Sequence, residues 1–295
     1  MITNRILLFG GSGQIGKAIQ QRPLPNGWVL GMPTHADCDF TRPGDIARAV
    51  RDFAPDIIIN AAAMTDIEAC EKEPEKAMQI NFSAVATLAG HCDTINAPLI
   101  QLSTDYVFDG TKETPYTPDD AMNPLNAYGK SKLMGEEAAR HGLYWHTIVR
   151  TSLVFSATGS NILTKTLRQI DTQDEINAAS DQYANPTSAD FVAESLMTMA
   201  SAILNGKGNG FGTFHICGEP AVTRYEFLHA IMDAYAPFTD RRPKLIPVAS
   251  ADIPNRTPRP LYSAMNCDKV QTSYDISPRS WRDDLGQAVN AQSHR

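Results

Sequence analysis

A tyrosine and a lysine stand four residues apart in the stretch NAYGKSKLMG, residues 126–135. This spacing places Tyr128 and Lys132 on one face of a helix, because positions four apart are neighbours on its surface. A nearby ammonium favours the phenolate, so Lys132 should lower the tyrosine pKa from its usual value of about 10. The pair predicts a general acid for a carbonyl oxygen. The same spacing is also typical of a packed tyrosine beside a solvated lysine.

Two hydroxyl groups precede this pair in the chain. The apolar run PLIQLST, residues 98–104, indicates a strand that ends with Ser103 and Thr104. Ligands of open parallel sheets bind at the carboxyl ends of the strands. A hydroxyl at this position could hydrogen-bond the same carbonyl oxygen that Tyr128 protonates.

The sequence GGSGQIG carries glycines at a G-x-x-G-x-x-G spacing near the N-terminus. Glycines allow a tight turn and a close approach to a pyrophosphate, and the helix that follows supplies N–H donors. A flexible turn could show the same spacing, but the place directly after an apolar strand favours a dinucleotide site. The predicted cofactor contacts in this loop are Gly10, Gly13, Gln14, Ile15 and Gly16.

The choice of dinucleotide depends on the segment GMPTHADCDF, residues 31–40. NAD-binding members of this fold place a carboxylate about twenty residues after the glycines, on the adenosine ribose. Here the nearest carboxylates, Asp37 and Asp39, stand several residues into a loop. No acid would repel a 2′-phosphate, so we expect NADPH or NADH with NADPH favoured. Asp39 and Phe40 are the candidate contacts from this segment.

Apolar runs alternate with helical patterns over the first half of the chain. Strands are predicted at 5–9, 28–32, 56–63, 98–104 and 146–155, and helices at 14–21, 43–55, 73–96 and 131–142. This alternation builds βαβ units and predicts an α/β fold, a Rossmann-type doubly wound parallel sheet. The pattern weakens after residue 150. We expect an NAD(P)-binding domain over 1–150 and a smaller substrate region over 151–295, with segments near 174–180 and 213–217 returning to the first domain.

Composition excludes several classes of protein. The 295 residues carry a formal charge of −7 without a basic block, which argues against a nucleic-acid partner. Five widely spaced cysteines without a C-x-x-C pattern indicate reduced thiols of a cytoplasmic protein. No apolar run reaches the eighteen residues of a membrane span, and no signal peptide is recognisable. Histidines are not spaced like metal ligands, so we expect no metal site.

Several motifs occur together and in order between about residues 5 and 270. They are FGGSGQIG, NAAAMTDIEACEKEP, STDYVFDG, NPLNAYGKSKLMGE, RTSLVF, DQYANPTSA and TPRPLYSAMN. This set closely resembles the dTDP-4-dehydrorhamnose reductase family of extended short-chain dehydrogenases/reductases. The resemblance implies hydride transfer from NAD(P)H to the C4 ketone of dTDP-4-dehydro-L-rhamnose, giving dTDP-L-rhamnose. It implies a nucleotide-sugar site in the C-terminal region. We expect the chain to be a monomer or homodimer.

The resemblance also implies roles for individual residues. Tyr128 would be the proton donor, Thr104 its partner on the substrate oxygen, and Lys132 the ligand of the nicotinamide ribose. Asn81 would support the site from its helix, and Arg259 would face the substrate diphosphate. Further cofactor contacts would come from Ala61, Ala62 and Ala63, and the substrate contacts from Thr65, Thr104, Asp105, Tyr106, Leu153, Asn161 and Arg259.

Two positions depart from the family pattern. Leu153 stands where RTSW would place an aromatic side chain against the sugar, so the identity of the hexose stays open. Lys17 and Ala18 stand where some members carry a glutamate for a metal-linked dimer, so bound magnesium is not expected.

Other functions on the same scaffold also stay open. A nucleotide-sugar dehydratase would carry a glutamate at Tyr106, so elimination is disfavoured, whereas an epimerase is excluded less firmly. A non-catalytic NADP-binding subunit, similar to the regulatory subunit of methionine adenosyltransferase, could have lost Tyr128, Lys132 and Thr104. All three residues are present.

Overall fold

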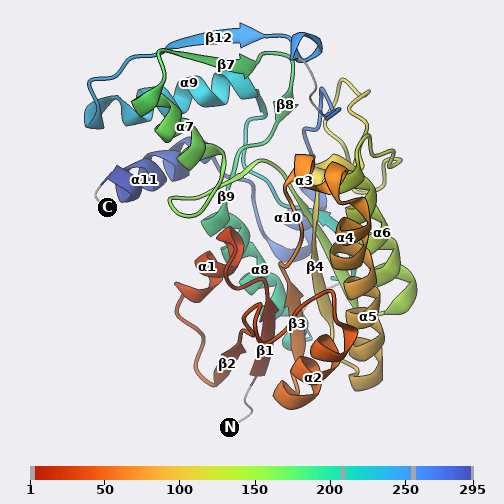
Figure 1. Ribbon diagram of the computed structural model, residues 1–295. Coiled ribbons are helices and arrows are strands. Elements are labelled where there is room, and N and C mark those ends of the chain that lie inside the picture. The colour runs from red at the N-terminus through yellow and green to blue at the C-terminus, as the bar shows by residue number, and fades with distance from the viewer. Residues whose placement is uncertain (1–3, 207–209, 254–256, 294–295) are drawn as a thin grey trace.

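A parallel sheet of six strands forms the centre of the molecule (Figure 1). The computed structural model describes residues 4–206, 210–253 and 257–293. In spatial order the strands are β10 (Gly212–His215), β5 (His146–Thr151), β4 (Leu99–Thr104), β3 (Ile57–Asn60), β1 (Asn4–Phe9) and β2 (Trp28–Gly31), each parallel to its neighbours. The predicted doubly wound α/β fold is confirmed.

Both faces of this sheet are covered by helices, because successive side chains of a strand point to opposite faces. Ile6 and Leu8 belong to one buried cluster, whereas Leu7 and Phe9 belong to another. The first face packs against α1 (Gln14–Gln20), α8 (Ala189–Leu204) and α10 (Asp268–Tyr274), and the second against α2 (Pro43–Phe53), α5 (Ala84–Ile95) and α6 (Ala127–Gly142).

The segment between β3 and β4 is more broken than the sequence pattern indicates. A short helix, α3 (Ile67–Lys72), was not predicted, and the Asp66 carboxylate caps it by accepting from the Ala69 N–H. The predicted helix 73–96 consists of α4 (Pro74–Met78), a π-helical turn η1 (Gln79–Ser83) and α5. Such π-helical turns occur frequently at functional sites, and this one carries Asn81.

Helix α6 begins before the helical pattern at 131–142 and includes Tyr128 and Lys132, as their spacing predicts. The Asn126 side chain accepts a hydrogen bond of 2.8 Å from the Gly129 N–H and so caps the helix. Tyr128 therefore lies in the first turn of α6, with Lys132 one turn later. The 3-10 turn η2 (Asp105–Val107) follows β4 directly.

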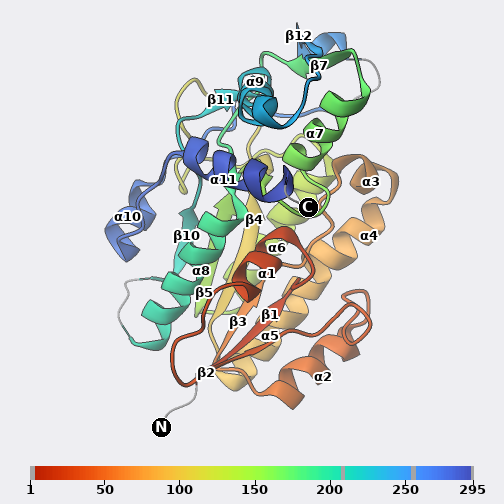
Figure 2. The ribbon, with the colours of Figure 1, turned by 90° about the vertical axis from the view of Figure 1, so that its left-hand side faces the viewer.

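A smaller unit lies over the carboxyl end of the sheet, where α7, α9, β7 and β12 are grouped at the top of Figure 2. Its buried core includes Phe155, Phe227 and Trp281. Its elements are β6 (Val154–Phe155), α7 (Ile162–Thr172), β7 (Glu175–Ala179), β8 (Tyr183–Ala184), β9 (Thr187–Ser188), β11 (Val222–Thr223), α9 (Arg224–Tyr235), η3 (Ala236–Phe238), β12 (Lys244–Val248), η4 (Ser250–Asp252) and α11 (Trp281–Ser293).

One predicted return to the first domain is wrong. The segment near 174–180 forms β7, which pairs in parallel with β12 and joins the smaller unit. Ile176 and Ala178 are buried in its core while Glu175 and Asn177 are exposed. This alternation is typical of a strand with one solvated face, not of a strand buried inside a parallel sheet. The segment near 213–217 begins in β10, which is hydrogen-bonded to β5.

Candidate active site

A cleft of about 1050 Å³ lies between the carboxyl ends of the sheet strands and the smaller unit. This volume is that of a large small-molecule site. The predicted site residues that line it are Gly13, Gln14, Ile15, Gly16, Ala61, Ala63, Thr65, Thr104, Asp105, Tyr106, Tyr128, Lys132, Leu153, Asn161 and Arg259. Gly10, Asp39, Phe40 and Ala62 are not among its lining residues.

Tyr128, Thr104 and Lys132 meet in this cleft. The Tyr128 phenol is hydrogen-bonded to the Thr104 hydroxyl, and the Lys132 ammonium donates a 2.7 Å bond to the Leu102 carbonyl at the end of β4. Burial raises the Tyr128 pKa, although the bond to Thr104 acts in the opposite direction. The expected lowering of this pKa by Lys132 is therefore wrong. Burial instead lowers the Lys132 pKa to about 8.

Asp105 fixes the position of Thr104. Its carboxylate is 3% exposed and accepts hydrogen bonds from Ser263 at 2.6 Å, Ser152 at 2.8 Å and Thr104 at 3.1 Å. Burial raises the Asp105 pKa. The Thr104 oxygen also accepts from the Tyr106 N–H at 3.2 Å. These contacts orient the Thr104 hydroxyl without any bound ligand.

The glycine loop has the shape that a diphosphate requires. Gly10 has a φ of +82°, and a Cβ there would lie 2.5 Å from the Ala61 carbonyl carbon. A Cβ on Gly16 would lie 2.2 Å from the Gly10 oxygen. Gly13 precedes α1 and offers no side-chain cap, so the first N–H groups of the helix stay available to an anion. The loop thus fits the phosphates of NAD(P).

Asp39 and Phe40 lie beyond β2 and outside the cleft lining. The Asp39 carboxylate accepts bonds of 2.9 and 2.8 Å from the N–H and hydroxyl of Thr41, which lower its pKa. The Phe40 ring packs edge-on against Phe9 in the core, with centroids 5.2 Å apart. The structure therefore explains both side chains by local packing.

Asn81 joins three segments beside the cleft. Its amide accepts from the Met64 N–H and donates to the Met64 carbonyl, both at 2.9 Å, and donates to the Ser131 hydroxyl at 2.9 Å. The loop that carries Thr65 is thereby attached to α6. The side chain thus has the supporting place that the resemblance implies.

Two guanidinium groups, those of Arg224 and Arg259, also line the cleft. Arg259 forms an ion pair of 3.4 Å with Glu68, and its buried Nε has no hydrogen-bond partner among the described residues. Arg224 begins α9 and hydrogen-bonds Tyr106, and burial together with the nearby Arg259 charge lowers its pKa. Two adjacent cations repel each other, and an anion bound between them offsets this repulsion. This part of the cleft therefore suits a phosphate or diphosphate.

Arg224 was not predicted from the sequence as a site residue. The one available signal is the capping box of Thr223 and Glu226, which marks the start of a helix and places Arg224 in its first turn. The smaller unit contributes further lining residues that the sequence did not indicate, among them Lys165, Gln169 and Asn177.

Comparison with known proteins assigns the chain to a family. The family model described as "RmlD substrate binding domain" matches residues 4–294. The chain belongs to this family. A dTDP-4-dehydrorhamnose reductase of Sinorhizobium fredii is 36% identical over 97% of this chain and 96% of the relative.

Solved structures agree with this assignment. The crystal structure of a dTDP-4-dehydrorhamnose reductase from Clostridium acetobutylicum has a TM-score of 0.89 at 28% identity, covering 97% of this chain and 98% of that chain. The enzyme of the same name from Bacillus anthracis, in complex with NADP, has a TM-score of 0.87 at 26% identity with the same coverage. The resemblance found in the sequence is confirmed.

At Leu153 this chain departs from the family pattern, which has an aromatic residue at this position. Leu153 has a φ of +42° and lines both the large cleft and an adjoining cavity of about 50 Å³.

The described residues contain no group of three His, Cys, Asp or Glu side chains placed to hold a metal ion. Within the same residues no helix is long and apolar enough to cross a membrane.

Proposed function

We propose that this chain reduces the C4 ketone of dTDP-4-dehydro-L-rhamnose to dTDP-L-rhamnose, with NADPH or NADH as the hydride source. The observation that carries the proposal is the meeting of Tyr128, Thr104 and Lys132 in one cleft. A glycine loop of the dinucleotide type and two guanidinium groups line the same cleft. The cleft thus combines a proton donor with residues suited to a cofactor and to an anion.

The residues of this chain perform the acid part of the reaction. Bound NAD(P)H would supply a hydride to the C4 carbon, and the C4 oxygen would become strongly basic. Tyr128 keeps its proton because burial raises its pKa, so it can give that proton to the oxygen. Thr104 donates its single hydroxyl proton to Asp105 in the free chain and would turn it to the same oxygen when the sugar binds. Lys132 offers its remaining N–H donors to the cofactor ribose.

The cofactor is proposed to be NADPH, with NADH also accepted. Neither Asp37 nor Asp39 lines the cleft, and the Asp37 carboxylate is occupied by the N–H and hydroxyl of Thr34 at 3.0 and 2.7 Å. No carboxylate in this segment is then placed to repel a 2′-phosphate. The Bacillus anthracis relative was crystallised with NADP. Michaelis constants for the two cofactors test this preference, and a strong NADH preference would contradict it.

The substrate diphosphate is proposed to bind between Arg224 and Arg259. Guanidinium groups bind phosphate oxygens through paired, charge-assisted hydrogen bonds. The Arg259 Nε, which has no hydrogen-bond partner within the part of the chain that the structure describes, is one donor that such a ligand would satisfy. The sugar would then lie between these cations and Tyr128, against Leu153.

NADPH oxidation by the purified chain in the presence of dTDP-4-dehydro-L-rhamnose tests the proposal directly. We expect one NADPH consumed per sugar and dTDP-L-rhamnose as the product identified by NMR. A product formed without net NADPH consumption would indicate an epimerase. Tight NADPH binding without oxidation would point first to another nucleotide-4-keto-sugar, because of Leu153, and second to a non-catalytic regulatory subunit.

The proposed setting is the cytoplasm, and the proposed assembly is a monomer or homodimer. All five cysteines are buried thiols without a disulfide, which suits a reducing compartment. Light scattering of the purified chain would determine the assembly.

A further inference from the structure

Glu136 is a carboxylate with no exposed surface on α6, one turn after Lys132. Its Oε1 accepts from the Ser103 hydroxyl at 2.5 Å and from Arg150 Nε at 2.9 Å. Its Oε2 accepts from Arg150 Nη2 and Arg140 Nη2, each at 2.7 Å. Burial opposes ionisation, but the bonds from Arg150 and Ser103 hold the Glu136 pKa below its usual value. The carboxylate therefore stays charged inside the protein.

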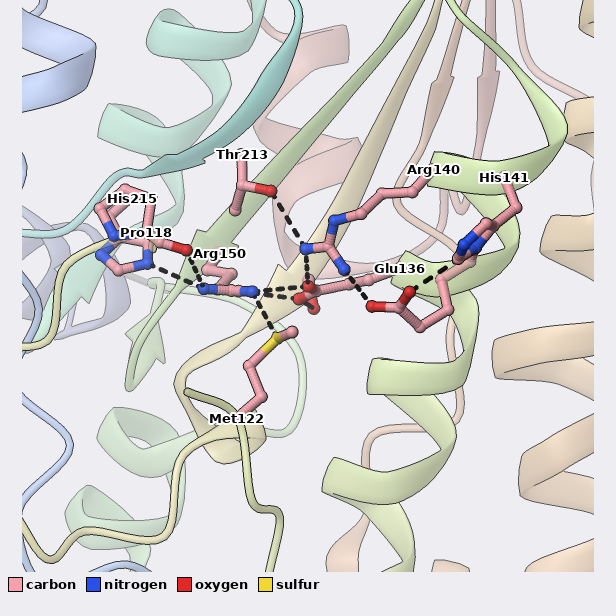
Figure 3. A network of polar contacts seen from close by, with 10 residues as sticks. Pro118, Met122, Glu136, Arg140, His141, Arg150, Thr213 and His215 are labelled. Atoms are coloured by element: carbon pink, nitrogen blue, oxygen red, sulfur yellow. Dashed lines mark hydrogen bonds and ion pairs between the residues drawn. The ribbon is translucent and has the colours of Figure 1, made fainter. Parts of the chain in front are cut away.

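The partners of Glu136 are themselves fixed, as Figure 3 shows. Arg150 is fully buried on β5 and donates to the Pro118 carbonyl at 3.2 Å, while its Nη1 lies 3.4 Å from His215 Nε2. Arg140 reaches the Thr213 hydroxyl on β10 at 3.1 Å. The carboxylate thus connects α6 to β5, and Arg140, which the carboxylate holds, connects the same helix to β10.

A third strand, β4, is held at two successive residues. Lys132 donates to the Leu102 carbonyl, and Ser103 donates to Glu136. The next residue along β4 is Thr104. Because Tyr128, Lys132 and Glu136 are spaced four apart, they share one face of α6. The two bonds therefore set the position of this helix face relative to Thr104.

We propose that Glu136 is a positioning residue for the reaction proposed above. It holds α6 in register with the end of β4, so that Tyr128 meets Thr104. It also supplies the buried negative charge that lies nearest to the Lys132 ammonium along the helix. The inference rests on the proposed function. Burial and Glu136 are the two influences on the Lys132 pKa, and Glu136 raises it. Without this charge Lys132 would lose its proton at a lower pH.

Other titratable groups lie on the elements packed against α6. They are Tyr128, Lys130, Glu137, Arg140 and His141 on α6 itself, Asp105 and Tyr106 on η2, His146 and Arg150 on β5, Glu68, Cys70, Glu71 and Lys72 on α3, and His91, Cys92 and Asp93 on α5, while the charged side chains of α4 are exposed. Among the charged groups of the described residues, Glu136 is the one that acts on the Lys132 pKa. We therefore ascribe the expected change in pH dependence to Glu136.

The test compares Glu136→Gln with the matched control Glu137→Gln. Glu137 is the next residue on α6, is 35% exposed and pairs with Arg140. For Glu136→Gln we expect kcat to fall about tenfold or more and the alkaline limb of the kcat profile to move down by about one pH unit. Glu137→Gln should keep both values. A folded Glu136→Gln variant with the unaltered kcat and pH profile, or an equal change in Glu137→Gln, would overturn the proposal.

Glu136→Gln leaves Arg150 buried without its carboxylate and could prevent folding. Two milder variants then decide the question. Ser103→Ala removes the hydrogen bond to Glu136 but keeps the Glu136 charge. We therefore expect kcat to fall while the alkaline limb of the kcat profile stays at the same pH. Glu136→Asp should likewise keep the limb. An unchanged kcat in Ser103→Ala would overturn the positioning role, and a shifted limb in Glu136→Asp would overturn the role of the charge.

A direct measurement separates this inference from the proposed function. The lysine ¹³Cε signals of the labelled protein can be titrated by NMR, with Lys132→Arg used to assign Lys132. We expect its pKa near 8 in the native chain and lower in Glu136→Gln. An inactive native chain with this result would contradict the proposed function alone. An unchanged Lys132 pKa in Glu136→Gln would contradict the inference alone.

Discussion

Tyr128 is surrounded so that it holds a proton rather than loses one. Burial raises its pKa, and the ammonium that the sequence places beside it is directed to the Leu102 carbonyl. A phenol in this state is a competent acid toward a forming alkoxide over the whole neutral range. With its pKa near 8, Lys132 is the first of the two groups to lose its proton as the pH rises.

Replacing Tyr128 by phenylalanine removes the proposed acid and little else. The ring contact with Tyr106, with centroids 5.7 Å apart, can persist. We expect Tyr128→Phe to lower kcat by about 10² or more while NADPH binding and thermal unfolding stay close to those of the native chain. Steady-state kinetics and fluorescence titration of NADPH measure the two effects. Turnover near the native value would remove Tyr128 from the mechanism.

Arg224 should act on binding of the nucleotide sugar and not on the cofactor. A charged hydrogen bond to a phosphate contributes about 1.5–3 kcal/mol, so Arg224→Gln should raise the KM for the sugar substrate about tenfold or more. The KM for NADPH should stay unchanged. Arg241→Gln is the control, because Arg241 lies in the smaller unit, pairs with Asp174 and does not line the cleft. Equal KM values for Arg224→Gln and the native chain would exclude the proposed diphosphate site.

The residues that could be found from sequence are those in short motifs. Tyr128, Lys132, Thr104 and the glycines stand at spacings that have a local meaning. The Asp105 network could not be found this way, because its partners Ser152 and Ser263 are 47 and 158 residues away. Local periodicity shows which side chains are buried but does not show which distant polar groups will meet them.

Helix α6 is the element on which the site depends most directly. Its start is set by Asn126, and its first turn packs closely against η2. The spacing of Tyr128 and Lys132 indicated that both lie on this helix, although the clear helical pattern runs only over 131–142, and the capping role of Asn126 was not used. The unpredicted helix α3 is six residues long, too short to show a clear period.

Gly129 should be required for the contact between α6 and η2. A Cβ at this position would lie 2.2 Å from the Tyr106 carbonyl oxygen, so Gly129→Ala must push the helix start away. We expect a large loss of kcat and a lower midpoint of thermal unfolding. Gly90→Ala in α5 is the matched control, since nothing lies within 4 Å of its Cβ and alanine favours helix by about 1 kcal/mol. A fully active Gly129→Ala variant would show that the close approach is dispensable.

Over the whole molecule, the alternation of strands and helices was predictable because a parallel sheet covered on both faces needs continuous apolar strands. The course of the chain after residue 150 was predictable only in part. The return expected near 213–217 corresponds to β10 in the main sheet, whereas the pairing of β7 with β12 was not expected. All these segments are short or amphipathic, so their partners are decided by packing between distant parts of the chain.

The edge of the main sheet carries a histidine that should make stability depend on acid. His215 on β10 is fully buried, with Nδ1 3.1 Å from the Asn266 carbonyl and Nε2 facing Arg150. Burial first, and the Arg150 charge second, lower its pKa to about 3. His215 therefore stays unprotonated in the folded state at pH values below about 6.5, where the unfolded state binds a proton at this residue.

The difference in the His215 pKa between the folded and the unfolded state predicts how the free energy of unfolding changes with pH. Between about pH 6.5 and pH 3 the unfolded state binds one more proton, so the free energy of unfolding should fall by up to about 1.4 kcal/mol per pH unit on acidification. Urea unfolding from pH 4.5 to 8 gives the change in the free energy of unfolding per pH unit. In His215→Gln this change should be smaller than in the native chain by the amount that corresponds to about one proton. His35→Gln, at an exposed position, should leave the slope unchanged. If His215→Gln keeps the full acid dependence, other groups must account for it, and the buried contact with Arg150 would then have no part in the pH dependence of folding.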